Sequence, residues 1–263
     1  MLEISFRNMK RKKIKGILAP TSMAVLLLLA STIVAANLSL QAVYAQGSFF
    51  KDPKNISETN VESSFEAVRG KNIATSGKYV YVTWREDVPG NPEIYFTRST
   101  DGGKTFEKPE SISGNVVMPA NSQIAAYGKN VYVVFQGTSP AGDVEIFLAR
   151  STDRGEDFDR PKNISNEPGA SEIPNIDVFE DNVFVVWEQE IPGAPVFTFD
   201  IFVTGSNNGG DDFDEPKPKN ISNNPGESRN AQVSVSEDTA YVVWEDDQGI
   251  GGMLDIFFNR GKD

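Results

Sequence analysis

Acidic side chains recur at one place in this sequence, directly after apolar runs that end in an aromatic residue. Paired carboxylates there could act as acid and base on a glycosidic bond, or could supply the oxygen ligands that Ca²⁺ prefers. The alternative interpretation is a solvated acidic rim, because an acidic composition alone produces one. The binding-face candidates are Glu86, Asp87, Glu188, Glu190, Glu245 and Asp246.

The composition limits the chemistry available to these acids. The chain has 263 residues and contains no His and no Cys. A Ser-His-Asp triad, a thiolate nucleophile and a His or Cys zinc site are therefore excluded. We expect no cofactor, with Ca²⁺ left open as a ligand. The net charge of −12 disfavours nucleic acid and anionic lipid as partners.

The elements that must position the acids repeat four times along the chain. Each repeat has one β-branched and aromatic run that ends in Trp or Phe, and a shorter run that begins with an acid followed by Ile. Such runs, bounded by Gly, Asn, Asp and Pro, are typical of β-strands. The longer runs cover 79–84, 130–135, 182–187 and 239–244, and the shorter ones cover 93–96, 145–148, 200–203 and 255–258.

The strand composition predicts an all-β fold, a small β-propeller of four four-stranded blades. Both faces of the strands are apolar, as in the sequence YVVW at 241–244, so each sheet should be packed between neighbours. The fourth repeat stops after its third strand, whereas residues 49–57 resemble the fourth strand of the other repeats. We expect this N-terminal strand to close the last blade. A monomer is favoured, and an open ring that pairs with a second chain is the alternative.

A turn motif recurs after the third strand of three repeats: 99–106 (STDGGKTF), 151–158 (STDRGEDF) and 206–213 (SNNGGDDF). Asp or Asn can accept backbone N–H groups of the turn, and Gly provides the positive φ. The motif resembles the Asp box, or BNR repeat, of β-propellers whose best-known members are sialidases. We interpret its residues as structural, with calcium binding as the alternative. They are Asp101, Gly103, Phe106, Asp153, Gly155, Phe158, Asn208, Gly210 and Phe213.

The resemblance to sialidases implies three arginines on a substrate carboxylate and a Tyr–Glu pair. The weak catalytic candidates in this sequence are Arg69, Arg85 and Arg229. The Arg-Ile-Pro signature of the family is absent, because Gly70 and Lys71 follow Arg69. Tyr81, Tyr132 and Tyr241 share a position that Phe184 occupies in the third repeat, which indicates core packing.

The N-terminal stretch has the layout of a secretory signal peptide. Six Lys and Arg residues precede an apolar run at 23–36, and Val43-Tyr44-Ala45 resembles a cleavage site. We therefore predict a signal peptide at 1–45, a propeller domain at 46–263, and a secreted or extracellular-surface location. An uncleaved membrane anchor is the alternative, and we expect no other membrane contact. Asn55, Asn163 and Asn220 lie in Asn-Ile-Ser sequons, although the same three residues also fit the repeated strand.

A complete fold signature without a complete catalytic set favours a non-catalytic binding module over an enzyme. Its ligand could be an extracellular glycan, a protein or a cation. The alternative function is a sialidase-like glycoside hydrolase.

Overall fold

The computed structural model describes residues 51–65, 70–194, 198–213, 217–248 and 253–262. The predicted signal peptide and Arg69 therefore lie outside the described residues. The chain divides into Met1–Lys54 and Asn55–Asp263, and the fold is that of the second unit. No helix in the described ranges is long and apolar enough to cross a membrane.

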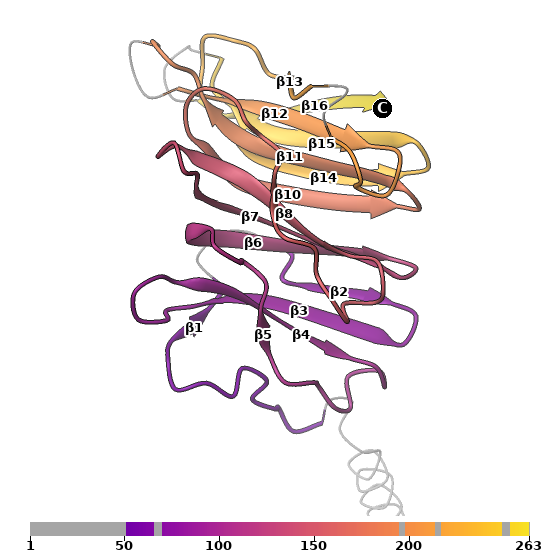
Figure 1. The fold of residues 1–263 in the computed structure, drawn as a ribbon. Coiled ribbons are helices and arrows are strands. Elements are labelled where there is room, and N and C mark those ends of the chain that lie inside the picture. The colour runs from indigo at the N-terminus through magenta and orange to yellow at the C-terminus, as the bar shows by residue number, and fades with distance from the viewer. Residues whose placement is uncertain (1–50, 66–69, 195–197, 214–216, 249–252, 263) are drawn as a thin grey trace, which may run out of the picture. The chain divides into compact units, whose positions relative to one another are not determined.

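In the described ranges, sixteen β-strands form four antiparallel sheets, named A to D in chain order (Figure 1). Sheet A contains β1 (Ser63–Ser64), β2 (Ile73–Ser76), β3 (Tyr79–Glu86), β4 (Glu93–Ser99) and β5 (Glu110–Ser111). Sheet B contains β6 (Val117–Tyr127), β7 (Asn130–Thr138), β8 (Val144–Ser151) and β9 (Lys162–Asn163). Sheet C contains β10 (Ser171–Phe179), β11 (Asn182–Glu190), β12 (Phe199–Ser206) and β13 (Lys219–Asn220). Sheet D contains β14 (Ser228–Ser236), β15 (Thr239–Asp246) and β16 (Asp255–Lys262).

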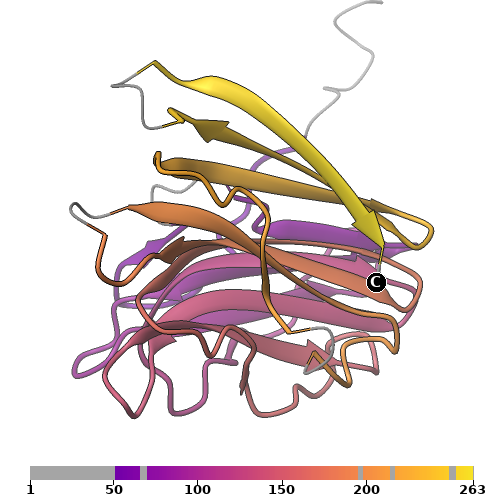
Figure 2. The same cartoon turned by 90° about the horizontal axis from the view of Figure 1, so that it is seen from above.

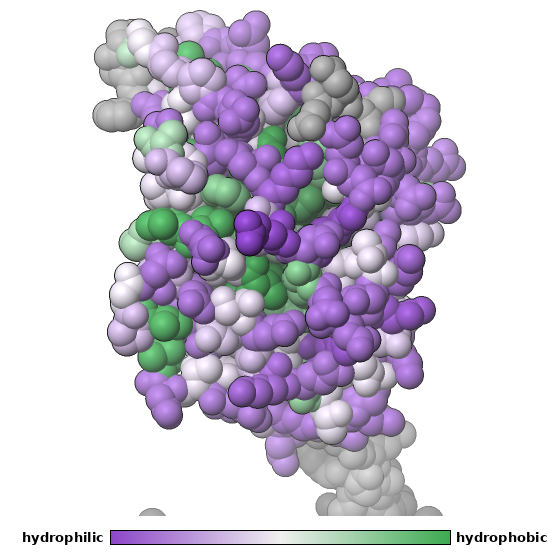
Figure 3. Space-filling view, viewed as in Figure 1, coloured by the Kyte–Doolittle hydropathy of each residue, from purple (hydrophilic) through white to green (hydrophobic). Residues whose placement is uncertain are grey.

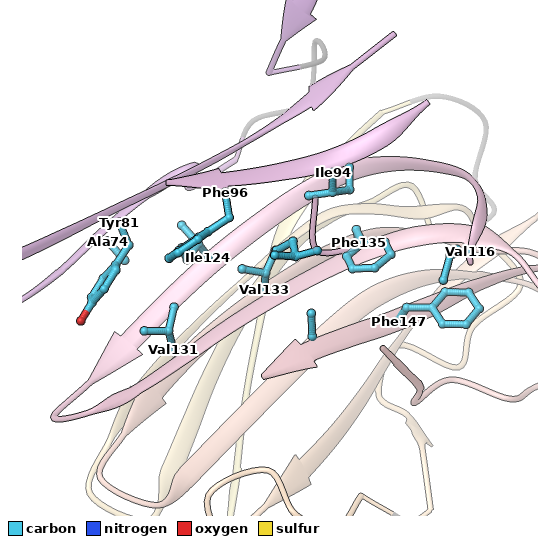
Figure 4. Close-up of a cluster of buried hydrophobic side chains, with 12 residues drawn as sticks. Ala74, Tyr81, Ile94, Phe96, Val116, Ile124, Val131, Val133, Phe135 and Phe147 are labelled. Atoms are coloured by element: carbon cyan, nitrogen blue, oxygen red, sulfur yellow. The ribbon is translucent and has the colours of Figure 1, made fainter. Parts of the chain in front are cut away.

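The sheets follow one another as blades, which confirms the predicted all-β, four-bladed arrangement. Strands of sheet A contact sheet B, those of B contact sheet C, and those of C contact sheet D. The core lies between neighbouring sheets, and Figure 4 shows the cluster between A and B, where Phe96 and Phe135 pack with Val133. The face seen in Figure 3 is mostly hydrophilic, in keeping with the acidic composition.

The predicted closure of the last blade was wrong for the described residues. Sheet D has three strands, and its outer strand β16 pairs only with β15. Figure 2 shows β16 in yellow along the edge, with no strand beyond it. Residues 51–57 form no strand, and Asn55 accepts hydrogen bonds from the nearby backbone instead. Asn163 accepts the same local hydrogen bond while β9 pairs with β8, so the pairing also requires a partner strand within reach, which sequence similarity does not reveal.

Candidate functional site

The predicted acidic rim is in part a set of buried hydrogen-bond acceptors. Glu86 and Asp246 are 1 % and 0 % exposed, which corrects their assignment to a solvated face. The carboxylate of each accepts the indole N–H of the Trp two residues earlier, at 2.9 Å for Glu86 and 3.0 Å for Asp246. Successive strand residues alternate faces, so positions two apart lie on the same side of the strand. These acids therefore satisfy buried indoles and are not available to a ligand.

The sequence contains a signal for this arrangement. In the third repeat Gln189 takes the same place and accepts the Trp187 indole N–H at 2.9 Å. In the second repeat Phe replaces Trp, and Gly137 stands where the acceptor would be. An acceptor thus accompanies each Trp, which indicates a structural pair.

Glu188 lies in a crevice between sheets C and D and is also buried, contrary to the expected rim. Its Oε1 accepts the backbone N–H of Asn230 at 2.8 Å, and its Oε2 lies 3.7 Å from Arg229 Nη1. Burial is the main cause that raises the pKa of Glu188, while the Asn230 N–H and Arg229 oppose the rise. The crevice therefore holds a carboxyl group that protonates more easily than an ordinary Glu.

The remaining rim acids have partners of their own. Asp87 forms an ion pair with Arg85 at 3.0 Å, and Glu190 accepts the backbone N–H of Ala170 at 3.1 Å. Glu245 accepts from the Asn230 side chain at 2.7 Å. Each of these contacts lies within one sheet or joins it to its own loop.

The two catalytic arginine candidates that the structure describes, Arg85 and Arg229, each pair with nearby acids. Arg229 on β14 pairs with Glu188 and with Glu227, and its guanidinium lies 4.9 Å from the centre of the Phe199 ring. Arg85 on β3 has Asp87 as its ion-pair partner. A substrate carboxylate would have to displace these acids. The predicted convergence of three arginines stays a prediction, because Arg69 lies outside the described residues.

The tyrosines at the shared strand position behave as core residues in two repeats. Tyr81 and Tyr132 are buried within the clusters between blades. Burial is the main cause that raises the pKa of each to about 12. Neither is placed to act as a nucleophile.

The three Ser-x-Asp/Asn turns are held by their own hydrogen bonds. Asp101 Oδ1 accepts the backbone N–H groups of Lys104 and Thr105, both at 2.9 Å. Ser99 Oγ donates to Asp101 and accepts the N–H of Gly103 at 2.9 Å. Asp153 and Asn208 occupy the same place in the other two turns, and each accepts the backbone N–H four residues later at 3.1 Å. Hydrogen bonds from Thr105 are the main cause that holds the pKa of Asp101 below its usual range.

These turns also join neighbouring blades. Gly155 adopts a φ of +75°, and a Cβ added there would lie 2.6 Å from the Phe96 ring of sheet A. The Phe158 ring packs edge-on against the same ring, with centroids 4.7 Å apart. In the next turn Phe213 is buried in the cluster between sheets B and C. The turn residues therefore have structural contacts that explain their types.

A cavity of ligand size lies elsewhere, where the inner strands of three blades meet. It measures about 510 Å³ and is bordered by residues 70–73, by β10 at 175–177 and by β14 at 232–234. Drug-sized ligands occupy pockets of about 300–1,000 Å³. By contrast, the cavity beside Asn230 near the acidic crevice measures only about 10 Å³. The axial cavity is therefore the better candidate site.

The lining of the axial cavity is polar and nearly neutral in charge. Its charged groups are Lys71 and Asp177, whose Nζ and Oδ1 atoms form an ion pair at 3.3 Å. Asn72, Asn175 and Gln232 bring amide groups, and the exposed Ile73 adds an apolar surface. Amides both donate and accept hydrogen bonds, so this lining suits a ligand rich in hydroxyl groups. Sequence reasoning missed these residues because they lie on the first strands or, for Lys71 and Asn72, just before one, where there is no repeated motif.

Two of these side chains are fixed by contacts with the next blade. Asn175 Oδ1 accepts the N–H of Val233 at 3.0 Å, and Asp177 Oδ2 accepts that of Val235 at 2.9 Å. Their orientation is thus set before any ligand arrives. Within the described ranges, no group of three or more acidic side chains is arranged to hold a metal ion.

Comparison with known proteins identifies the fold alone. No family model and no curated protein matches this chain. Among solved structures, a Hadza microbial sialidase has a TM-score of 0.52 at 14 % identity, over 75 % of this chain and 44 % of its own. A protein of unknown function from Dyadobacter fermentans has 0.54 at 16 %, over 73 % and 52 %. The phage phi92 endosialidase has 0.52 at 14 %, over 72 % and 35 %. The chain thus spans about half the length of these structures, or less.

Proposed function

We propose that this propeller, of the kind seen in sialidases, is an exported binding module for uncharged glycans and that it does not cleave them. The three Ser-x-Asp/Asn turns are then Asp boxes with a structural role. The axial cavity is the binding site. The observation that carries the proposal is a cavity of about 510 Å³ lined by amides and by one internally neutralised ion pair.

The lining favours a sugar over other ligands. Hydroxyl groups of a sugar can pair with the amides of Asn72, Asn175 and Gln232, while its apolar CH face can lie against Ile73. An anionic sugar meets Asp177 and the strongly acidic chain around it, which disfavours sialic acid. Among the described residues that line the cavity, Asp177 is the one carboxylate, whereas acid/base cleavage needs two.

Calorimetric titration of the full chain with neutral and sialylated oligosaccharides tests the proposal. We expect a neutral oligosaccharide to bind with a Kd below about 1 mM and sialylated ones at least about tenfold more weakly. Tighter binding of the sialylated set, or no binding of any neutral glycan on an array, would refute the proposal.

A variant pair locates the site. Gln232→Ala removes an exposed amide from the cavity and should weaken binding by about fivefold, the value of one hydrogen bond of roughly 1 kcal/mol. Gln248→Ala removes an exposed amide in the loop after β15 and should leave the Kd unchanged. Equal effects of the two substitutions would place the site elsewhere.

A sialidase-like hydrolase is the second candidate, and Glu188 is the observation that favours it. A buried carboxyl group with a raised pKa beside an arginine has the character of a general acid. Release of sialic acid by the full chain between pH 4 and 7, abolished by Glu188→Gln, would support this function over the binding module. Turnover that survives Glu188→Gln would remove Glu188 from the reaction.

A further inference from the structure

In the part of the chain that the structure describes, sheet D has three strands where sheets B and C have four, and apolar side chains on its outer strand are exposed. Ile256 and Phe258 on β16 are 74 % and 60 % exposed, whereas Ile146 and Leu148 at the same positions of β8 are 0 % and 3 % exposed. In sheet B these two residues pack against Ile164, which follows β9, and against Ile176 and Trp187 of sheet C. Within the described residues, sheet D has no further sheet on that face, and its edge also lacks the equivalent of β9 and its isoleucine.

The chain carries one spare copy of that segment. Residues 50–57 read FKDPKNIS, and residues 158–165, which form the end of the second turn and β9, read FDRPKNIS. The two segments differ only at their second and third positions. Lys219-Asn220-Ile221-Ser222 repeats the last four residues at β13. Local sequence that forms this strand twice should form it again when a partner edge is offered.

The end of the spare segment, from Asn55 to Ser57, already makes the local backbone contacts of the paired copies. Ser57 N–H donates to Asn55 Oδ1 at 3.1 Å, as Ser165 N–H does to Asn163 Oδ1 at 3.1 Å. The residue after each Ser has a positive φ: 52° at Glu58, 45° at Asn166 and 40° at Asn223. A segment held in its bound conformation loses little entropy on docking.

A cleft between sheets C and D matches the aromatic residue that begins the segment. It measures about 480 Å³ and includes Phe184, Val203 and Ile221 of sheet C and Ala240 and Val242 of sheet D. The corresponding space between sheets B and C is filled by Phe213. The cleft thus has room for one more aromatic side chain from the edge of sheet D.

The cleft is not built to receive another Ser-x-Asp/Asn turn. Between sheets B and C, Tyr132 and Arg150 donate to the carbonyl of Gly209 in such a turn, at 3.1 and 3.0 Å. In sheet C the same cross-strand pair is Phe184 and Gly205, which offer no side-chain donor. An apolar ring without a turn carbonyl fits this surface, and Phe50 has no such turn motif before it.

We infer that residues 50–57 of a second copy of this chain complete sheet D. Phe50 of that copy fills the cleft, and Lys54–Ser57 pair antiparallel with β16. The register follows from Phe147 opposite Asn163 and Phe202 opposite Asn220, which puts Asn55 opposite Phe257. Ile56 then covers Ile256 and Phe258.

A second copy is the donor because the chain's own segment is tethered at the wrong sheet. Glu62 accepts the backbone N–H of Asp87 at 3.0 Å, and Ser63 and Ser64 pair with β3. Ser57 can lie at most roughly 17 Å from Glu62 along five residues. Figure 1 shows sheets A and D at opposite ends of the stack. Sheets A and D approach each other only where residues 70–73 and β14 border the axial cavity, and β16 lies two strands further out, at about 4.8 Å per strand.

Cysteine cross-linking tests the pairing, since the chain has no native Cys. In sheet C, Ser222 Oγ donates to Asp200 Oδ1 at 3.1 Å, and in sheet B Ser165 makes the same contact with Glu145. The equivalent pair here is Ser57 of one copy and Asp255 of the other. Full-length Ser57→Cys and Asp255→Cys chains are mixed, oxidised and separated without reductant. Asn259→Cys replaces Asp255→Cys as an equally exposed control on β16.

We expect a disulfide-linked dimer from the first mixture, at least about tenfold more than from the control, because Asn259 lies roughly 13 Å further along the strand. Adding Phe50→Asp to the Ser57→Cys chain should abolish the excess. Equal cross-linking of both mixtures overturns the pairing. A third chain carries both Ser57→Cys and Asp255→Cys, and a disulfide that forms only within this chain, as a monomer, overturns the second copy as donor. A full chain that sediments as a monomer at tens of micromolar also overturns it.

Discussion

Asp246 is the acceptor on which the end of sheet D most depends. Its carboxylate is fully buried and accepts from Ser228 Oγ at 2.7 Å, Asn224 Nδ2 at 2.6 Å, Trp244 Nε1 at 3.0 Å and the Gln248 N–H at 2.7 Å. Asp246→Ala would leave these donors without a partner. Removing one member of a buried charged network costs about 3–5 kcal/mol. Asp246→Asn keeps one oxygen acceptor and should cost about 1–3 kcal/mol.

Thermal unfolding followed by Trp fluorescence measures this loss of stability as a fall in Tm. For a chain of this size, about 1 kcal/mol lowers Tm by roughly 2–4 °C, so Asp246→Ala should lower Tm by roughly 6–20 °C. Asp238→Ala removes an exposed acid that pairs with Lys262 and serves as the control, with little expected change. A loss for Asp246→Ala no larger than that of the control would refute the assignment of Asp246 as a structural acceptor.

The effect should also depend on pH. Burial alone would raise the pKa of Asp246, but hydrogen bonds from Ser228, Gln248, Trp244 and Asn224 outweigh it and lower the pKa. A lowered folded-state pKa stabilises the protein above the unfolded value of about 3.9, and that stability is lost as the pH falls through the folded value. The difference between wild type and Asp246→Ala should therefore shrink below about pH 4. A difference that grows on acidification would contradict the sign.

Three further predictions concern the core, the turns and the crevice. Tyr132→Phe removes the hydroxyl that donates to the Gly209 carbonyl at 3.1 Å and should lower the free energy of unfolding by about 1 kcal/mol. Tyr81→Phe removes a buried hydroxyl without a hydrogen-bond partner in the described structure and should leave that free energy unchanged or raise it. Equal losses of stability in urea unfolding would contradict this. Gly155→Ala should lower the free energy of unfolding by about 2–4 kcal/mol, because Gly155 has a φ of +75° and the new Cβ would lie 2.6 Å from Phe96. Gly90→Ala should lower it by about 1 kcal/mol, because Gly90 has a φ of +104° but open space around it. The two values of Tm measure the difference. Because burial raises the pKa of Glu188, wild type should gain stability relative to Glu188→Gln as the pH falls from 7 towards 4, and a constant difference across that range would argue against a perturbed carboxyl.

Much of the fold could be predicted from short segments of the sequence. Each run that ends in Trp or Phe became a middle strand, and each acid-Ile run became a third strand, because alternating contacts on both faces need β-branched and aromatic residues. The Ser-x-Asp/Asn turns formed with the expected acceptors, since a carboxylate or amide reaches the N–H groups of its own turn. Such contacts involve residues a few positions apart and depend little on the rest of the chain.

The candidate site was less accessible to sequence reasoning. An acid after a strand looks the same whether it faces water, as Asp87 does, or accepts an indole N–H, as Glu86 does. The difference follows from which sheet covers the strand end. Gln232 and Asn175 can be recognised as cavity-lining residues only once the first strands of separate blades are known to meet around one cavity.

The sequence by itself determined the repeats, the strands, the turns and the absence of His and Cys chemistry. Only the tertiary structure decided that Glu188 is buried beside Arg229, and that in the described structure β16 has a free edge while residues 51–57 form no strand. The physical reason is that a strand's hydrogen-bonding pattern is set by its own residues, whereas burial and edge pairing depend on which surfaces meet.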